Sequence, residues 1–207
     1  MKQRALFLDR DGTLVYPVHY PTRPEQLRLY RDLGPQLRVL QHMGFLMVVI
    51  TNQSGLARGY FSAEELDRMH EHLRTQLLDL GVKLAGIYHC PHHPEGTVPE
   101  FALECECRKP APGMLLRAAQ DLDIELSRSW LIGDILDDIE AGKRAGCRTV
   151  LVDLETEPAP ECALRQPDFV ACSTRHALQI IHTVETLSPR IDLLYQPASW
   201  RQKPEQR

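Results

Sequence analysis

The sequence has no long apolar run, no signal-peptide pattern in its first residues and no excess of basic residues, and each of these absences narrows the range of expected functions. No stretch of the 207 residues is long and apolar enough to span a bilayer, so we expect no membrane partner. Residues 1–4 lack the apolar run and small-residue cleavage site of a signal peptide, which predicts a cytoplasmic protein. The net charge of −4 argues against a broad nucleic-acid-binding surface.

What the chain does contain is a regular alternation of strand-like and helix-like segments. Short apolar, partly β-branched runs alternate with segments whose apolar residues recur at helical spacing. The expected strands are residues 5–8, 45–50, 85–89, 130–132 and 149–152, with 168–171 as an edge strand; the expected helices are 33–43, 63–80, 112–122, 135–145 and 173–187. This order predicts an α/β fold with a doubly wound, mostly parallel sheet.

The division of the chain follows from its composition. Residues 1–187 have the length and the pattern of one domain with its own core. Residues 188–207 are rich in proline and polar side chains, and we expect this C-terminal tail to lie over the surface or to be disordered. A monomer is expected.

Polar side chains follow four of the predicted strands, at the points where the strands end. Asp9 and Asp11 follow the first strand, residues 51–55 (Thr-Asn-Gln-Ser-Gly) the second, and Gly133-Asp134 the fourth. The third strand opens a Cys/His-rich loop that ends in residues 108–110, Arg-Lys-Pro. Since ligands of doubly wound folds bind at the carboxyl ends of the strands, these groups predict one site.

The residue types at this predicted site suit phosphoryl transfer. Asp9 can attack phosphorus and form an aspartyl-phosphate, and Asp11 can protonate the leaving oxygen and then activate water. Thr51 and Lys109 can stabilise the phosphoryl oxygens. Asp9 and Asp134, with the Asp11 carbonyl as a third ligand, offer hard oxygens for Mg²⁺. The ordinary alternatives are a solvated surface lysine at 109 and a helix N-cap at Asp134.

The Cys/His-rich loop, residues 90–107, has the composition of a structural zinc site. Cys90 and His92 are one residue apart, as are Cys105 and Cys107, and three thiolates with one imidazole complete a tetrahedral set. A Cys-X-Cys pair is poorly suited to a disulfide because so short a loop is strained. His93 is a competing ligand and His89 a weaker one. Unrelated reduced thiols are the alternative, as expected in the cytoplasm.

The four motifs together resemble those of the haloacid dehalogenase (HAD) superfamily. Residues 9–13 (Asp-Arg-Asp-Gly-Thr), residues 51–55 followed by residues 57–59 (Ala-Arg-Gly), and residues 90–94 (Cys-Pro-His-His-Pro) resemble D-glycero-D-manno-heptose 1,7-bisphosphate phosphatases and the related histidinol-phosphatase domains. The resemblance implies a Rossmann-like HAD fold without a large cap domain. It also implies Mg²⁺ and Zn²⁺ as cofactors, with His92 as the zinc-binding histidine.

The same resemblance implies roles for individual residues. Asp9 is the implied nucleophile, Asp11 the general acid and base, and Thr51 and Lys109 stabilise the phosphoryl group. Magnesium is implied at Asp9, Asp11 and Asp134. The implied substrate-binding residues are Asn52, Arg58 and Arg108. The substrate is then a small phosphorylated sugar, hydrolysed at the C7 phosphate of the heptose bisphosphate.

Two departures from the family pattern affect the substrate. The residue after Asp134 is usually lysine in the family but is Ile135 here, and residues 16–21 (Tyr-Pro-Val-His-Tyr-Pro) lack the glycine of the family loop. Both positions lie where the non-reacting end of the substrate would rest. The alternatives are therefore a histidinol-phosphate or other small-metabolite phosphatase and, from another class, an inactive phosphate-binding or interaction module. The intact Asp9–Asp11 pair argues against the inactive module.

Overall fold

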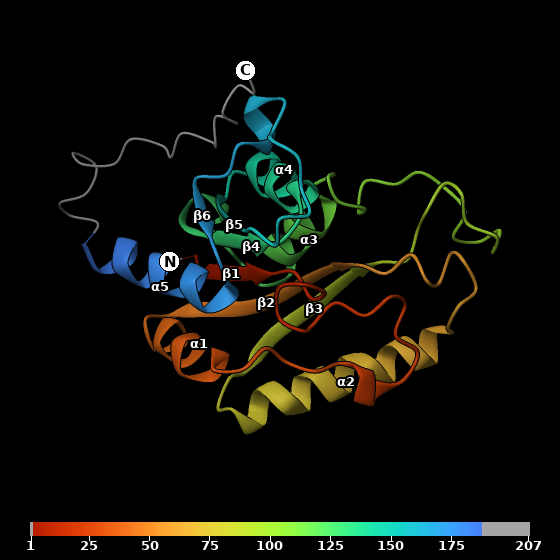
Figure 1. Ribbon diagram of the computed structural model, residues 1–207, viewed down its shortest axis with the longest axis horizontal. Helices are drawn as coiled ribbons and strands as arrows, with labels where there is room; N and C mark the ends of the chain where they lie inside the picture. The colour runs from red at the N-terminus through yellow and green to blue at the C-terminus, as the bar shows by residue number, and fades with distance from the viewer. Residues whose placement is uncertain (1, 188–207) are drawn as a thin grey trace, which may run out of the picture.

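The computed structural model describes residues 2–187, which form a six-stranded sheet covered by helices on both faces (Figure 1). The strands are β1 (Arg4–Leu8), β2 (Phe45–Asn52), β3 (Leu84–Cys90), β4 (Trp130–Gly133), β5 (Arg148–Val152) and β6 (Phe169–Ala171). Their order is β3-β2-β1-β4-β5-β6, and every neighbouring pair is parallel. The predicted doubly wound α/β fold is confirmed. The tail predicted at 188–207 lies outside the described residues.

The helices divide between the two faces of the sheet. They are α1 (Leu33–His42), α2 (Ala63–Asp79), α3 (Gly113–Asp121), α4 (Leu136–Ala145) and α5 (Thr174–Leu187). In Figure 1, α1, α2 and α5 lie below the sheet, and α3 and α4 lie above it. Among residues 2–187, none of the helices has the length and the apolar character needed to cross a bilayer.

Alternating side chains of the strands fill two separate cores. In β1, Leu6 and Leu8 pack with the helices of the lower layer, whereas Ala5 and Phe7 pack with α3 and α4. This alternation follows from the two-residue repeat of an extended strand, and burial on both faces accounts for the continuous apolar run of β1. The central strands are thereby fixed, and their carboxyl ends share one edge of the sheet.

Short 3₁₀ helices interrupt the connections, at Pro24–Gln26, Leu126–Arg128 and Ala163–Arg165, and the sequence pattern did not predict them. Three-residue turns are too short to carry an apolar repeat, so periodicity cannot detect them. No separate cap domain is present among residues 2–187. The segment between β1 and α1 passes over the carboxyl edge of the sheet instead.

Candidate active site

The side chains predicted to act together meet at the carboxyl edge of β1, β2 and β4. Asp9 follows β1, Thr51 is the second-last residue of β2, and Asp134 follows β4. Gly12 has a φ of +81°, and a Cβ atom there would lie 2.1 Å from Oδ2 of Asp134. Only glycine therefore allows the loop after β1 to close onto Asp134.

Lys109 is buried between two carboxylates, which excludes a solvated surface lysine at this position. Its Nζ atom lies 2.5 Å from Oδ1 of Asp9 and 2.5 Å from Oδ1 of Asp138, and its side chain is 2% exposed. Burial alone would lower the pKa of Lys109, but the charges of Asp138 and Asp9 outweigh burial and raise it. Lys109 is therefore charged and brings positive charge to the site.

Asp138 is a site residue that the sequence did not reveal. It lies on the first turn of α4, four residues after Asp134, and its side chain is fully buried. Besides Lys109, it accepts a hydrogen bond from the backbone N–H of Ile135. A Cβ on Gly133 would lie 2.2 Å from Cβ of Asp138, so that glycine gives Asp138 room to turn inward. The available signal was an acidic residue in the first turn of the helix that follows Asp134, which is ordinary at a helix N-terminus.

The N-cap interpretation of Asp134 is wrong. Ile135 is the N-cap of α4, with extended backbone at φ −121° and ψ 157°, so the helix begins one residue later than that interpretation requires. The Asp134 carboxylate instead accepts a hydrogen bond from the Thr13 hydroxyl at 3.1 Å. It is therefore free to face Asp9 rather than the first turn of the helix.

Three carboxylates lie close enough to share a cation. One oxygen each of Asp9, Asp134 and Asp138 lies within 4.8 Å of the others. Burial raises the pKa of Asp9 to about 7. The positive charge of Lys109 lowers this pKa, and the negative charges of Asp138 and Asp11 raise it. Burial and the charge of Asp9 raise the pKa of Asp134 to about 8. The single positive charge of Lys109 does not balance three carboxylates. The oxygen atoms of these carboxylates suit a hard divalent cation such as Mg²⁺.

The side chains of Asp11 and Asn52 are not part of the carboxylate cluster of Asp9, Asp134 and Asp138. The Asp11 side chain is outside that cluster and contacts Arg10 and Gln53, so magnesium binding through its carbonyl stays a prediction. Asn52 exchanges two hydrogen bonds with the backbone of Lys109: Nδ2 donates to the carbonyl at 3.2 Å, and Oδ1 accepts from the N–H at 3.1 Å. Asn52 thus holds the loop that carries Lys109, and its predicted substrate contact stays a prediction.

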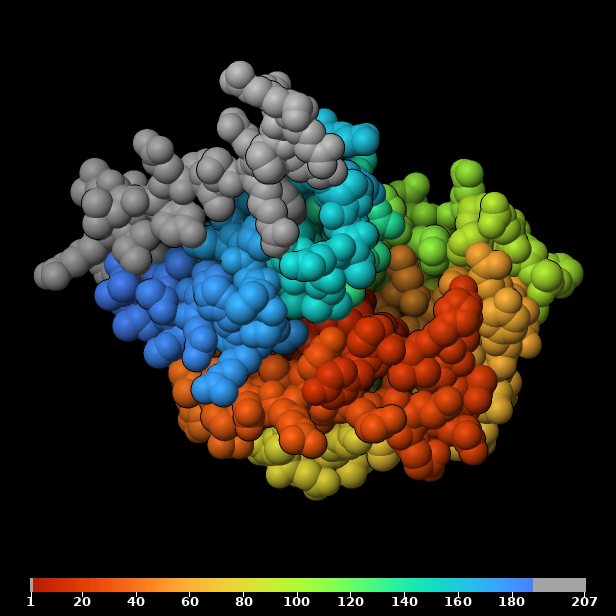
Figure 2. All heavy atoms as spheres, viewed as in Figure 1, coloured from red at the N-terminus to blue at the C-terminus, as the bar shows by residue number. Residues whose placement is uncertain are grey.

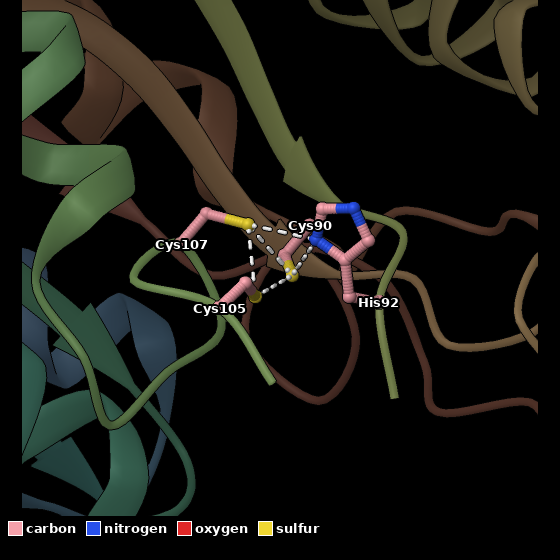
Figure 3. A group of neighbouring side chains, drawn as sticks. All are labelled: Cys90, His92, Cys105 and Cys107. Atoms are coloured by element: carbon pink, nitrogen blue, oxygen red, sulfur yellow. Dashed lines mark hydrogen bonds between the residues drawn. The ribbon is translucent and has the colours of Figure 1, made fainter. Parts of the chain in front are cut away.

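The Cys/His-rich loop closes into a compact cluster (Figure 3). Cys90 ends β3, and the side chains of Cys90, His92, Cys105 and Cys107 point toward one another. Their sulfur and Nδ1 atoms are 3.0–3.8 Å apart. These separations are too long for a disulfide and near the roughly 3.7 Å between ligands of a tetrahedral zinc site. Hydrogen bonds with Cys90 and Cys105 lower the pKa of Cys107 to about 5, whereas the bond with Cys107, together with burial, raises the pKa of Cys90, so without a metal the negative charge of the cluster is concentrated on Cys107.

The structure decides between the two neighbouring histidines. His93 points away from the cluster: its Nε2 lies 3.3 Å from Nη2 of Arg58, and its Nδ1 accepts a hydrogen bond from the N–H of Glu95. His89 packs against His70 at a ring-centroid distance of 5.3 Å. His92 is the histidine in the cluster, as the family resemblance implied.

Arg58 and Arg108 are both attached to this loop. Arg108 donates from Nη1 to the carbonyl of His92 at 3.3 Å, next to the Arg58–His93 contact. Slight burial and then the charges of Arg108 and Arg58 lower the pKa of His93. The two predicted substrate-binding arginines therefore both lie near His93, and their contact with substrate stays a prediction.

The segment between β1 and α1 forms one wall of a cleft over the site. In Figure 2 this segment, in red, lies beside the segments that follow β2 and β3, in orange and green. Tyr20 approaches Ser54, with 3.4 Å between their hydroxyl oxygens, and packs edge-on against Tyr60. The cleft is lined by Arg10, Asp11, Val18, His19, Tyr20, Pro21, Asn52, Gln53, Ser54 and Gly55. Residues 18–21, part of the loop that departs from the family pattern, therefore line this cleft.

Comparison with known proteins finds phosphatases among the relatives of this chain. The family model described as HAD-hydrolase-like matches residues 106–177. A D-glycero-beta-D-manno-heptose-1,7-bisphosphate 7-phosphatase from Pasteurella multocida is 41% identical over 168 residues, which cover 81% of this chain and 91% of that protein.

Two solved structures share the fold over most of the chain. A HAD-like phosphatase from Mesorhizobium loti matches with a TM-score of 0.78 and 33% identity, covering 90% of this chain and 88% of that one. The D,D-heptose 1,7-bisphosphate phosphatase from B. bronchiseptica, complexed with magnesium and phosphate, matches with a TM-score of 0.73 and 27% identity, covering 87% of this chain and 99% of that one.

Proposed function

Because this chain belongs to the D-glycero-beta-D-manno-heptose-1,7-bisphosphate 7-phosphatase family of HAD-like hydrolases, we propose that it hydrolyses the C7 phosphate of that heptose bisphosphate. The observation that supports this most strongly is the buried group of Lys109 between Asp9 and Asp138, with Asp134 beside it. Several carboxylates would repel a phosphate ester unless positive charge offset them. The buried Lys109 supplies such charge, as phosphoryl transfer requires.

The chain's own residues then divide the reaction into two steps. In the first, a carboxylate oxygen of Asp9 attacks phosphorus, the bond to the sugar oxygen breaks, and Asp11 gives that oxygen its proton. In the second, Asp11 takes a proton from water, the water oxygen bonds to phosphorus, and the bond between phosphorus and the Asp9 oxygen breaks, which releases phosphate and restores the Asp9 carboxylate. Lys109 and Thr51 contact the phosphoryl oxygens, and Lys109 stays charged because its pKa is raised.

We assign magnesium to Asp9 and Asp134, with the Asp11 carbonyl as a third ligand, and add Asp138 as a neighbour of that site. Bound magnesium supplies divalent positive charge that screens the repulsion between the Asp9 carboxylate and the phosphate. We assign zinc to Cys90, His92, Cys105 and Cys107, where it would hold the loop that carries Arg108 and Lys109 without entering the chemistry. A cytoplasmic location and a monomeric state stay predictions.

The second phosphate of the substrate would rest near Arg58 and Arg108. Both arginines are anchored to the Cys/His loop, and Arg58 is only partly exposed. Arg58 would also supply positive charge that the family's lysine provides at the position of Ile135. This arrangement favours a bisphosphate over an ester with a single phosphate.

The second candidate is a histidinol-phosphate phosphatase, and Ile135 is the observation that favours it. An isoleucine at the start of α4 gives no charge to the second phosphate of a bisphosphate. The mechanism at Asp9 and Asp11 would be the same for either substrate.

Steady-state kinetics with the heptose bisphosphate and with histidinol phosphate test the proposal, and ³¹P NMR identifies which phosphate is released. We expect a higher kcat/KM for the bisphosphate, with loss of the C7 signal and retention of the C1 signal. Arg58→Gln should raise KM for the bisphosphate and leave KM for histidinol phosphate nearly unchanged. A higher kcat/KM for histidinol phosphate would overturn the substrate assignment.

A further inference from the structure

Arg10 lies between the two catalytic aspartates in the sequence, yet nothing in the mechanism above uses it. Its side chain is one of the largest that are fully buried, at 1% exposed. A buried guanidinium is costly unless charged or polar partners satisfy it. Its Nε and Nη2 atoms have such partners, whereas Nη1 has none among the described residues.

These partners are Asp11 and Gln53. Nε of Arg10 donates to Oδ2 of Asp11 at 3.0 Å, and Nη2 lies 2.8 Å from the same oxygen. Nη2 also donates to Oε1 of Gln53 at 3.0 Å. The amide of Gln53 in turn donates to Oδ2 of Asp11 at 3.1 Å. One oxygen of Asp11 is thus held by two side chains that also hold each other.

The other oxygen of Asp11 is in the opposite situation. Oδ1 has no hydrogen-bond partner among the described residues, although it is covered from bulk solvent. A covered acceptor without a partner is costly, and such groups usually await a water or a ligand atom. Because Oδ2 already receives several donors, Oδ1 is the oxygen that can carry the transferable proton.

Gln53 is itself held in place from several sides. Its amide donates to the hydroxyl of Thr51 at 2.8 Å, and its backbone N–H donates to the carbonyl of Cys90 at 2.7 Å. Its side chain is buried, at 4% exposed. The position of Gln53 is therefore set by β2 and by the end of β3.

We propose that Arg10 and Gln53 are positioning residues, which clamp Oδ2 of Asp11 so that Oδ1 faces the oxygen of the leaving group. The proton passes from Oδ1 to the sugar oxygen as the phosphorus–oxygen bond breaks, and Arg10 gives up no proton. This inference rests on the general acid and base role proposed for Asp11. It adds that orientation, and not only the presence of a carboxyl group, sets the rate of leaving-group departure.

The dependence of rate on the leaving group tests the clamp, because a misplaced acid matters most when the leaving oxygen is strongly basic. The probes are phenyl phosphate and p-nitrophenyl phosphate, which have similar shapes and leaving groups of different basicity. The measured quantity is kcat/KM, which reports leaving-group departure and not the later attack of water. We expect Arg10→Lys to lower kcat/KM about tenfold or more for phenyl phosphate and less than about threefold for p-nitrophenyl phosphate.

Three further variants make the result decisive. Arg4→Lys is the matched control, since Arg4 pairs with Glu185 through a part-buried guanidinium at the other end of β1, and it should leave both substrates near wild type. Gln53→Leu removes the second half of the clamp without removing a charge, and it serves if Arg10→Lys does not fold. The double variant Arg10→Lys/Asp11→Asn should be no slower than Asp11→Asn alone, because the clamp acts only through Asp11.

The outcomes separate the clamp from the role of Asp11. If folded Arg10→Lys and Gln53→Leu lower kcat/KM equally for both substrates, or not at all, the clamp is refuted. If Asp11→Asn itself shows no dependence on the leaving group, the general acid role is refuted first. Lysine keeps the charge of Arg10 but cannot span Asp11 and Gln53 as the planar guanidinium does, so a selective loss in Arg10→Lys supports orientation over charge.

Discussion

Replacing Lys109 by methionine should damage both stability and turnover. The substitution keeps the length of the side chain but removes the cation between Asp9 and Asp138, each 2.5 Å away. Breaking one partner from a buried ion pair costs about 3–5 kcal/mol, because an uncompensated charge is left behind. For a protein of this size, about 2–4 °C of melting temperature corresponds to each kcal/mol, so we expect Tm to fall by roughly 6–20 °C.

The loss of stability should depend on pH in a defined direction. Burial raises the pKa of Asp9 to about 7 even though Lys109 lowers it, so removing Lys109 should raise this pKa further. A carboxyl group whose folded-state pKa is raised costs no stability below its unfolded pKa, and the cost grows as pH rises toward the folded value. The Tm difference between wild type and Lys109→Met should therefore be larger at about pH 8 than at about pH 5.

Differential scanning calorimetry in magnesium-free buffer measures the effect, and Lys143→Met is the control. Lys143 forms an ion pair with an aspartate too, Asp168, but the side chains of Lys143 and Asp168 are both partly exposed. Such a pair is worth about 0–1 kcal/mol, so Tm should fall by less than about 4 °C. The Lys109 variant should also lose about 10²–10³ in kcat. A Tm within the control's range, or kcat above about a tenth of wild type, would refute the reasoning.

Three other predictions concern the metals and the substrate. The pKa values of Asp9 and Asp134 are raised to about 7 and 8, so protons compete with Mg²⁺ for these carboxylates at low pH. Mg²⁺ should therefore raise Tm more at about pH 8.5 than at about pH 6, and equal shifts at the two pH values would contradict this. Elemental analysis should find about one zinc per chain. Cys105→Ser should lose zinc and activity but keep its far-ultraviolet circular dichroism, whereas full activity in zinc-free protein would exclude a positioning role for zinc. Ile135→Lys should leave kcat/KM for the heptose bisphosphate unchanged or raise it by roughly tenfold, the value of a charge-assisted hydrogen bond, and a loss would point to a less polar substrate.

The main features of the fold and the site could be predicted because parallel strands deliver their next residues to one edge. Asp9, Thr51 and Asp134 come from three strands, and the side-by-side order of those strands brings them together. Lys109 could be assigned to the site from its place after the third strand, but its burial between two carboxylates could not.

Asp138 shows what local pattern cannot provide. An acidic residue in the first turn of a helix is ordinary, since it interacts favourably with the helix dipole. Its burial depends on the positive charge of Lys109, which comes 29 residues earlier in the chain and lies in the loop between β3 and α3. The choice of His92 over His93 has the same origin, because spacing alone permits both and the contact of His93 with Arg58 decides it.

The central claim is that Asp9 carries the phosphoryl group during turnover. The direct measurement is rapid acid quench during turnover with Mg²⁺, borohydride reduction of the acyl-phosphate, and mass spectrometry of the peptide that contains residues 5–15. The account predicts conversion of Asp9 to homoserine in substrate-treated wild type and none in Asp9→Asn or in enzyme without substrate. Reduction at Asp11 or Asp134 instead, or steady turnover by Asp9→Asn, would contradict it.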